Sequence, residues 1–169
     1  TWCFALVKLA KVMEADQTNR YQSKDGSGPL LDSERALAKY FGRKFAIGVN
    51  SGGMAIMLGL RAICAKLKKE QGSEIYTAPV VFSNAFTFNA VPSAVHNADL
   101  DVILVETLPN LTVDLDDLEK KIVDQKGLGK ANLILCLSYM RGRIPDMDRV
   151  LEICAKYGAI LLEDNAHGY

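Results

Sequence analysis

The chain has 169 residues, of which 49% are hydrophobic and 24% charged, and this ordinary globular composition excludes a disordered or fibrous protein. Twenty basic residues balance twenty acidic ones. With a formal net charge of zero, the chain has no basic field to attract nucleic acid or an anionic membrane surface.

The apolar opening stretch, residues 1–10, predicts neither a membrane span nor a signal peptide. Lys8 interrupts it and Lys11 directly follows it, well short of the about 20 apolar residues that a span needs. The chain also contains four widely spaced cysteines, Cys3, Cys64, Cys136 and Cys154. Without a C-x-x-C pair, they favour reduced core thiols of an intracellular, cytoplasmic protein over a metal site or a disulfide framework.

The first half of the chain predicts two helices, a strand and a long third helix. Residues 3–15 have apolar positions at helical spacing, and a polar connector follows. Asp32 or Ser33 is expected to cap a second helix that runs to Phe41 and stops at Gly42. We expect a short strand at 45–49 and a helix at about 54–69.

The second half alternates strands and helices. Strands are predicted at 75–82, 102–105, 133–137 and 159–162, with an irregularity at Pro79. Asp114 and Asp146 are expected to cap the two later helices, and Gly158 to end the second. Short apolar strands alternating with helices predict an α/β protein, a three-layer αβα arrangement around a mainly parallel sheet.

Ligands of such sheets bind at the carboxyl ends of strands, where three segments are of interest. In the first, the strand at 45–49 leads through Asn50-Ser51-Gly52-Gly53 straight into a helix. The unpaired amides of that helix start could bind a phosphate, although a tight packing turn would have the same residues.

The other two segments carry carboxylates and aromatic rings. Glu163, Asp164 and His167 follow a strand and could form a solvated strand end, a metal site, or a site where Asp164 faces a cationic ring. Phe86 and Phe88 flank Thr87 before a helix, and the two aromatic rings could be core or could stack on a flat ligand.

Taken in order, several motifs resemble one family of enzymes. These are N-S-G-G-x-A, A-F-T-F-N-A-V-P-S-A-V, L-D-D-L-E, G-R-I-P-D-M-D and I-L-L-E-D-N-A-H. The chain resembles the DegT/DnrJ/StrS sugar aminotransferases, pyridoxal phosphate enzymes of the aspartate-aminotransferase fold (fold type I). The resemblance implies that 28–169 is the N-terminal part of the large, cofactor-binding domain. Residues 1–27 would form an N-terminal helix and connector, with the C-terminal remainder and small domain absent.

The resemblance also assigns roles to site residues. Asp164 would contact the pyridine nitrogen and keep it protonated, His167 would lie near the ring hydroxyl, and Phe88 would stack on the ring. The phosphate would lie over Ser51, Gly52 and Gly53. The expected cofactor-binding set is therefore Ser51, Gly52, Gly53, Phe88, Asp164 and His167.

Several positions depart from the family pattern. Gly53 and Val91 stand where the family usually has threonine, Tyr139 where histidine is common, and Asn165 where alanine is usual. Ser138 and Tyr139, at the end of another strand, could line the pocket.

The resemblance implies a homodimeric transaminase of deoxyamino-sugar biosynthesis that moves an amino group from an amino acid such as glutamate to a nucleotide-linked keto-sugar. The Schiff-base lysine of the family lies C-terminal to the aspartate, and no lysine follows Asp164. The fragment alone is therefore expected to be inactive. Three alternatives stay open: a pyridoxal phosphate-dependent sugar dehydratase of the same family, a non-catalytic ligand-binding relative, and a metal site at Glu163, Asp164 and His167.

Overall fold

The structure is a computed structural model that describes residues 28–168. The helix predicted at 3–15 and Cys3 lie outside these residues. The chain divides into two compact units, Thr1–Asn50 and Ser51–Tyr169, which are described separately below.

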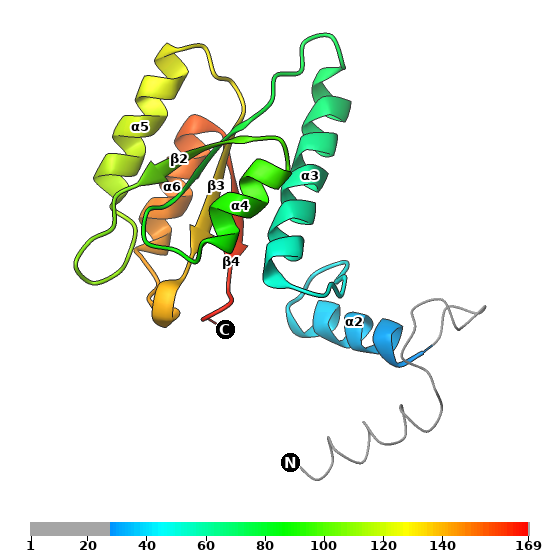
Figure 1. Ribbon diagram of the computed structural model, residues 1–169. Helices are drawn as coiled ribbons and strands as arrows, with labels where there is room; N and C mark the ends of the chain where they lie inside the picture. The colour runs from blue at the N-terminus through cyan, green and yellow to red at the C-terminus, as the bar shows by residue number, and fades with distance from the viewer. Residues whose placement is uncertain (1–27, 169) are drawn as a thin grey trace. The chain divides into compact units, whose positions relative to one another are not determined.

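The second unit is built on a four-stranded parallel sheet. Its strands are β1 (Val80–Asn84), β2 (Asp101–Val105), β3 (Leu133–Ser138) and β4 (Ala159–Asp164), in the spatial order β2-β1-β3-β4 (Figure 1). Every neighbouring pair is parallel. The carboxyl ends of all four strands therefore meet at one edge of the sheet, as the sequence predicts.

Helices cover both faces of this sheet. Helices α3 (Gly52–Gln71) and α4 (Ala90–Asn97) pack on one face, with Leu60, Val95 and Ile134 in their core. Helices α5 (Leu115–Gly127) and α6 (Met147–Tyr157) cover the other face, with Leu118, Val150 and Leu135 in the second core. A 3-10 turn, η1 (Met140–Gly142), follows β3. The predicted three-layer α/β arrangement is confirmed.

The predicted caps explain where the later helices begin and end. Asp114 accepts hydrogen bonds from the backbone N–H groups of Asp116 and Asp117, and Asp146 accepts one from Arg149 N–H. Gly158 ends α6 in the left-handed conformation. Each device satisfies backbone groups that a helix end leaves without a partner.

Strand β1 begins five residues later than predicted. Proline has no N–H to give to a sheet ladder, so the pairing starts only after Pro79, where Val80 N–H donates to Asn132 O. The strand predicted at 102–105 is confirmed as β2, although it is not buried over most of its length. Because β2 is an edge strand, only Val105 of its five residues is fully buried.

In the first unit, two predictions are wrong. Helix α2 (Pro29–Tyr40) begins at Pro29 with Gly28 as its N-cap, so Asp32 and Ser33 lie inside its first turns rather than before them. Residues 45–49 form no strand, and Phe45 and Ile47 are 73% and 74% exposed. An apolar run becomes a strand only when another strand pairs with it, and none does so within residues 28–168.

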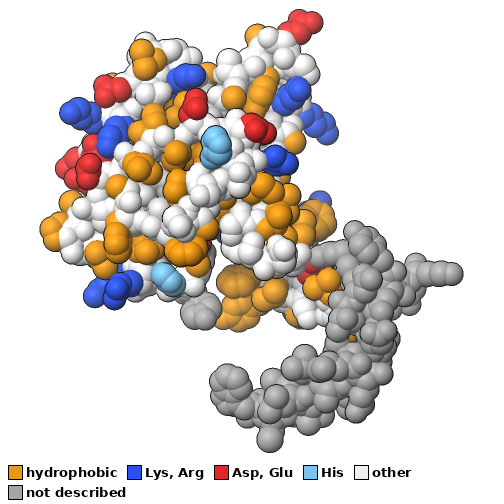
Figure 2. Space-filling view, in the orientation of Figure 1, with side chains coloured by type: hydrophobic (Ala, Val, Ile, Leu, Met, Phe, Trp, Pro, Cys, Tyr) orange, Lys and Arg blue, Asp and Glu red, His pale blue; other side chains and the backbone are white. Residues whose placement is uncertain are grey.

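Acidic and basic side chains both lie on the surface, in agreement with the net charge of zero. Figure 2 shows acidic and basic side chains over α5 and the last turns of α3, whereas hydrophobic side chains gather at the lower rim, toward which β3 and β4 run in Figure 1. None of the helices within residues 28–168 has both the length and the hydropathy needed to cross a bilayer.

The described cysteines are free thiols. Cys136 and Cys154 are buried and Cys64 is half-buried, so the core-thiol prediction is confirmed for the first two. The cytoplasmic localisation stays a prediction.

Candidate active site

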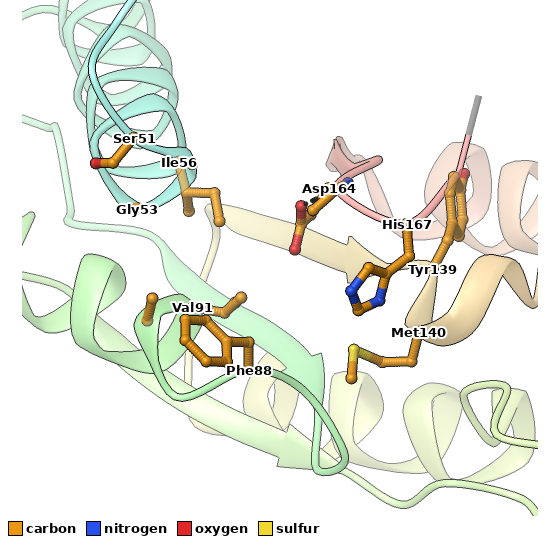
Figure 3. A pocket seen from close by; sticks show the side chains of 12 residues that line it. Ser51, Gly53, Ile56, Phe88, Val91, Tyr139, Met140, Asp164 and His167 are labelled. Atoms are coloured by element: carbon orange, nitrogen blue, oxygen red, sulfur yellow. Dashed lines mark hydrogen bonds between the residues drawn. The ribbon is translucent and has the colours of Figure 1, made fainter.

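A cavity of about 500 Å³ opens at the carboxyl edge of the sheet, within the second unit (Figure 3). Its volume lies in the range of small-molecule and cofactor sites. The first turn of α3, the loop before α4 and the segments after β3 and β4 all contribute to it. The lining residues are Ser51, Gly52, Gly53, Ile56, Phe88, Ala90, Val91, Tyr139, Met140, Asp164, Ala166 and His167.

All six residues of the predicted cofactor-binding set line this one cavity. The start of α3 and the end of β4 therefore share one pocket. Tyr139 also lines it, whereas Ser138 lies behind the wall and contacts Asp164. The roles assigned to these residues remain predictions.

Two lining residues, Ile56 and Met140, lie outside every sequence motif, whereas Ala90 and Ala166 lie within motifs but carry no predicted role. A signal existed for Ile56, because it lies four residues after Gly52 on the same face of a helix. Met140 directly follows Tyr139, but nothing in its own side chain marks it as a lining residue.

The start of α3 forms an open wall of the cavity that consists of small residues. Ser51 is the N-cap, and its hydroxyl accepts a hydrogen bond from Met54 N–H at 3.2 Å. A Cβ atom built at Gly52 would meet nothing within 4 Å, and one built at Gly53 would meet only Ala90 Cβ, at 3.7 Å. The backbone amides of this turn, with the positive end of the 20-residue helix behind them, suit an anion such as a phosphate.

The Asp164 carboxylate is held on both oxygens. Ser138 Oγ donates to Oδ2 at 2.9 Å, and the backbone N–H of Ala166 donates to Oδ1 at 3.2 Å. In turn, Thr87 Oγ1 donates to Ser138 Oγ at 2.9 Å. Asp164 thus enters the cavity as an oriented acceptor, as Figure 3 shows.

His167 is oriented by the turn after β3. Its Nδ1 accepts a hydrogen bond from Arg141 N–H at 3.2 Å. In a neutral imidazole the other ring nitrogen then carries the proton, so Nε2–H is the donor available to a ligand. Figure 3 shows the ring directed into the cavity, on the same side as Asp164.

Phe88 lies across the cavity from Asp164 and His167, beside Val91 (Figure 3). Its side chain is 67% exposed, which is high for a phenylalanine in a folded unit. An exposed ring face at a pocket wall is available to stack on a flat ligand. The alternative that this ring belongs to the core is wrong.

Glu163 and Asp164 have different surroundings, although they are neighbours in sequence. Successive residues of a strand point to opposite faces of the sheet. Glu163 accepts a hydrogen bond from the Tyr139 hydroxyl, and burial followed by this carboxylate raises the pKa of Tyr139. No cluster of three metal-ligating side chains occurs in the described part of the chain. The described residues therefore give no support to the metal-site alternative at Glu163, Asp164 and His167.

Beneath the cavity, the Cys136 thiol stays protonated. Burial first, and the nearby Asp164 carboxylate second, raise its pKa from 9.0 to about 12. A thiol in this state is a packing group and not a nucleophile at neutral pH.

The family model for the DegT/DnrJ/EryC1/StrS aminotransferases matches residues 8–169. The chain belongs to this family. It is a family of pyridoxal phosphate-dependent sugar enzymes that includes aminotransferases and a dehydratase.

Two curated relatives illustrate this range. The spore coat polysaccharide biosynthesis protein SpsC of Bacillus subtilis is 29% identical over 141 residues, which are 83% of this chain and 32% of SpsC. The GDP-4-keto-6-deoxy-D-mannose 3-dehydratase of Yersinia pseudotuberculosis is 29% identical over 135 residues, 78% of this chain and 31% of the relative. The chain thus spans about a third of the length of these members of the DegT/DnrJ/EryC1/StrS family.

Solved structures agree on the fold. S. venezuelae DesV in complex with a ketimine intermediate is 27% identical with a TM-score of 0.67, over 84% of this chain and 34% of DesV. An aminotransferase from Psychrobacter cryohalolentis has a TM-score of 0.71 at 17% identity, over 95% of this chain and 36% of that one, and supports the fold alone.

Proposed function

We propose that this chain is the N-terminal part of a pyridoxal phosphate-dependent aminotransferase that acts on a nucleotide-linked keto-sugar with an amino acid as amino donor. One observation carries this proposal: an anion-binding helix start and an oriented carboxylate line the same cavity. Family membership supports the reaction class, and the substrate for which the Yersinia dehydratase is named supports a nucleotide-linked keto-sugar.

The residues present fit the cofactor. When bound, pyridoxal phosphate supplies an electron-accepting ring whose strength depends on a protonated pyridine nitrogen. Asp164 would hold that proton at the ring nitrogen, and the amides at Gly52 and Gly53 would bind the phosphate. Phe88 would cover one ring face and help to exclude water, and His167 would donate through Nε2 to the ring oxygen.

The departure at Gly53 changes how the phosphate would be held. Where the family usually has threonine, this chain has a glycine and offers no hydroxyl. The backbone amides of the first turn of α3 and the Ser51 side chain must then bind the phosphate. Because Ser51, Gly52 and Gly53 have small side chains, a phosphate can come close to the backbone there.

We further propose a homodimer. On α3, Met54 and Leu58 are 37% and 42% exposed, and they lie four residues apart on one helical face. An exposed apolar face of this kind is suited to a second subunit. Light scattering of the whole protein should give twice the monomer mass, and a monomer would contradict the proposal.

The function is tested with the whole protein, a nucleotide-linked 4-keto-6-deoxy sugar and ¹⁵N-labelled glutamate. Mass spectrometry should find ¹⁵N in the sugar and one 2-oxoglutarate per amino group transferred. A deoxygenated sugar without ¹⁵N would indicate the dehydratase instead. Bound pyridoxal phosphate without either product would contradict the substrate class, and no bound cofactor would indicate the non-catalytic relative.

Asp164→Asn tests the assigned role of the carboxylate. A carboxylate about 4 Å from a cationic ring nitrogen contributes on the order of 4 kcal/mol at an effective dielectric of about 20, so kcat/KM should fall about 10³-fold. Asp148→Asn, in the exposed first turn of α6, is the matched control and should retain full activity. Equal activity of the two variants would remove Asp164 from the mechanism.

A further inference from the structure

Three elements of the second unit are connected by a chain of side-chain hydrogen bonds that ends on Asp164. Thr87, in the loop after β1, donates to Ser138 at the end of β3, and Ser138 donates to Asp164 at the end of β4. Ser138 is only 3% exposed. The hydroxyl therefore acts from behind the cavity wall and does not itself line the cavity.

The chemistry of the groups fixes the direction of this chain. An ionised carboxylate only accepts hydrogen bonds, so the single proton of Ser138 Oγ must point to Asp164 Oδ2. The Ser138 oxygen then has lone pairs to offer, and the Thr87 hydroxyl donates to one of them. Both hydroxyl protons thus point toward Asp164.

The backbone of Ser138 does not depend on this side-chain contact. The buried carboxamide of Asn84 donates to Ser138 O at 3.2 Å and accepts from Ser138 N–H at 3.1 Å. Strand β3 also pairs with β4 opposite Asp164 itself. The end of β3 is therefore held by other bonds, and the Ser138 hydroxyl remains free to orient the carboxylate.

We propose that Ser138 is a positioning residue whose hydroxyl, itself oriented by Thr87, fixes the rotation of the Asp164 carboxylate toward the ring nitrogen of the cofactor. This inference rests on the proposed function, because it takes pyridoxal phosphate as the ligand. With Oδ1 held by the Ala166 amide, loss of the bond to Oδ2 leaves the carboxylate with a single fixed point, about which it can rotate.

The test measures binding of two ligands to the whole protein by equilibrium titration. One is pyridoxamine 5′-phosphate, which has a ring nitrogen and no aldehyde to react with surface lysines. The other is its 1-deaza analogue, in which carbon replaces that nitrogen. Only the first ligand can use the orientation of Asp164.

We expect Ser138→Ala to weaken binding of pyridoxamine 5′-phosphate about tenfold, as for loss of one hydrogen bond to a charged group. Binding of the deaza analogue should change less than twofold. Ser138→Thr, which keeps the hydroxyl, should restore most of the affinity. Ser83→Ala is the matched control, because Ser83 is fully buried on neighbouring β1 and its hydroxyl has no hydrogen-bond partner among the described residues.

Each outcome of the titrations either supports or contradicts the role proposed for Ser138. If Ser138→Ala weakens both ligands equally, or neither, Ser138 has only a structural role and the inference is wrong. If the wild-type protein binds neither ligand, the proposed function itself fails. Should Ser138→Ala not fold, Thr87→Val gives the same test, because it removes the outer donor and should also weaken only the ligand with a ring nitrogen.

Discussion

Gly142→Ala should damage both the fold and the cofactor site, because two constraints meet at this residue. Gly142 has φ +71°, a conformation that costs an L-residue about 1–2 kcal/mol. A Cβ atom there would also lie 3.0 Å from the carbonyl oxygen of His167. That contact is with backbone, so relief requires the His167 segment to move, at a further cost of about 1–3 kcal/mol.

Gly158→Ala separates these two effects. Gly158 has φ +69°, nearly the same as Gly142, but a Cβ atom there would meet nothing within 4 Å. The free energy of unfolding of this control should fall only by the backbone cost of about 1–2 kcal/mol. That of Gly142→Ala should fall by about 2–5 kcal/mol in total.

Two measurements on the whole protein check this reasoning. Urea unfolding gives the free-energy loss of each variant, and titration with pyridoxamine 5′-phosphate gives the affinity. Because His167 must shift in Gly142→Ala, the affinity of this variant for pyridoxamine 5′-phosphate should fall. Gly158→Ala should bind the ligand as the wild type does. Equal losses of stability and unchanged affinity in both variants would refute the claimed contact.

Two further predictions concern the core. Leu118→Ala on α5 should lower the free energy of unfolding in urea by about 2–5 kcal/mol, because Leu118 is fully buried. The control Val123→Ala lies on the same helix at a position 50% exposed and should lower it by less than about 1 kcal/mol. Similar losses in the two variants would contradict the assigned packing. The Cys136 thiol, with its pKa raised from 9.0 to about 12, contributes stability that is complete below pH 9 and is lost as the pH rises toward 12, at about 1.4 kcal/mol per pH unit. Between pH 8 and pH 10 the unfolding free energy of wild type should therefore fall by about 1.4 kcal/mol more than that of Cys136→Ala, and parallel pH curves would show that the thiol has an ordinary pKa.

Sequence predicts those elements best whose ends are set by local chemistry. Asp114, Asp146 and Gly158 mark helix boundaries correctly, since a side-chain cap or a left-handed glycine acts within a few residues of itself. Strands β3 and β4 are equally clear, as short apolar runs flanked by such helices. In these cases local preference and global fold agree.

Prediction fails where the outcome depends on a distant partner. Residues 45–49 have the apolar pattern of a strand, but no strand within the described residues pairs with them. At α2, Asp32 is a good capping residue, yet the N-cap is Gly28, four residues earlier, because the fixed φ of Pro29 already suits a first helical position. The hydrophobic pattern alone therefore predicts neither whether residues 45–49 pair as a strand nor where α2 begins.

The candidate site shows the same division. Sequence identifies the residues that face the cavity, since motif order carries their types and spacing. The hydrogen bonds behind them are not visible in sequence, because Thr87, Ser138 and Asp164 are separated by 51 and 26 residues and meet only through the parallel register of the strands. Ser138 is an unremarkable serine in the sequence, and it becomes informative only opposite Asp164.

The parallel register also explains how adjacent carboxylates can serve different purposes. Glu163 and Asp164 end the same strand, but the pleat sends one toward the Tyr139 hydroxyl and the other toward Ser138 and the cavity. A one-residue slip of β4 would exchange their positions and would place Glu163 opposite Ser138. Residues 159–162 are apolar on both faces, with Leu161 packing on the α5–α6 face and Leu162 on the α3–α4 face, so the hydrophobic pattern alone does not oppose that slip. The hydrogen bonds from Tyr139 to Glu163 and from Ser138 to Asp164 favour the observed register, and this register determines which carboxylate reaches the cavity.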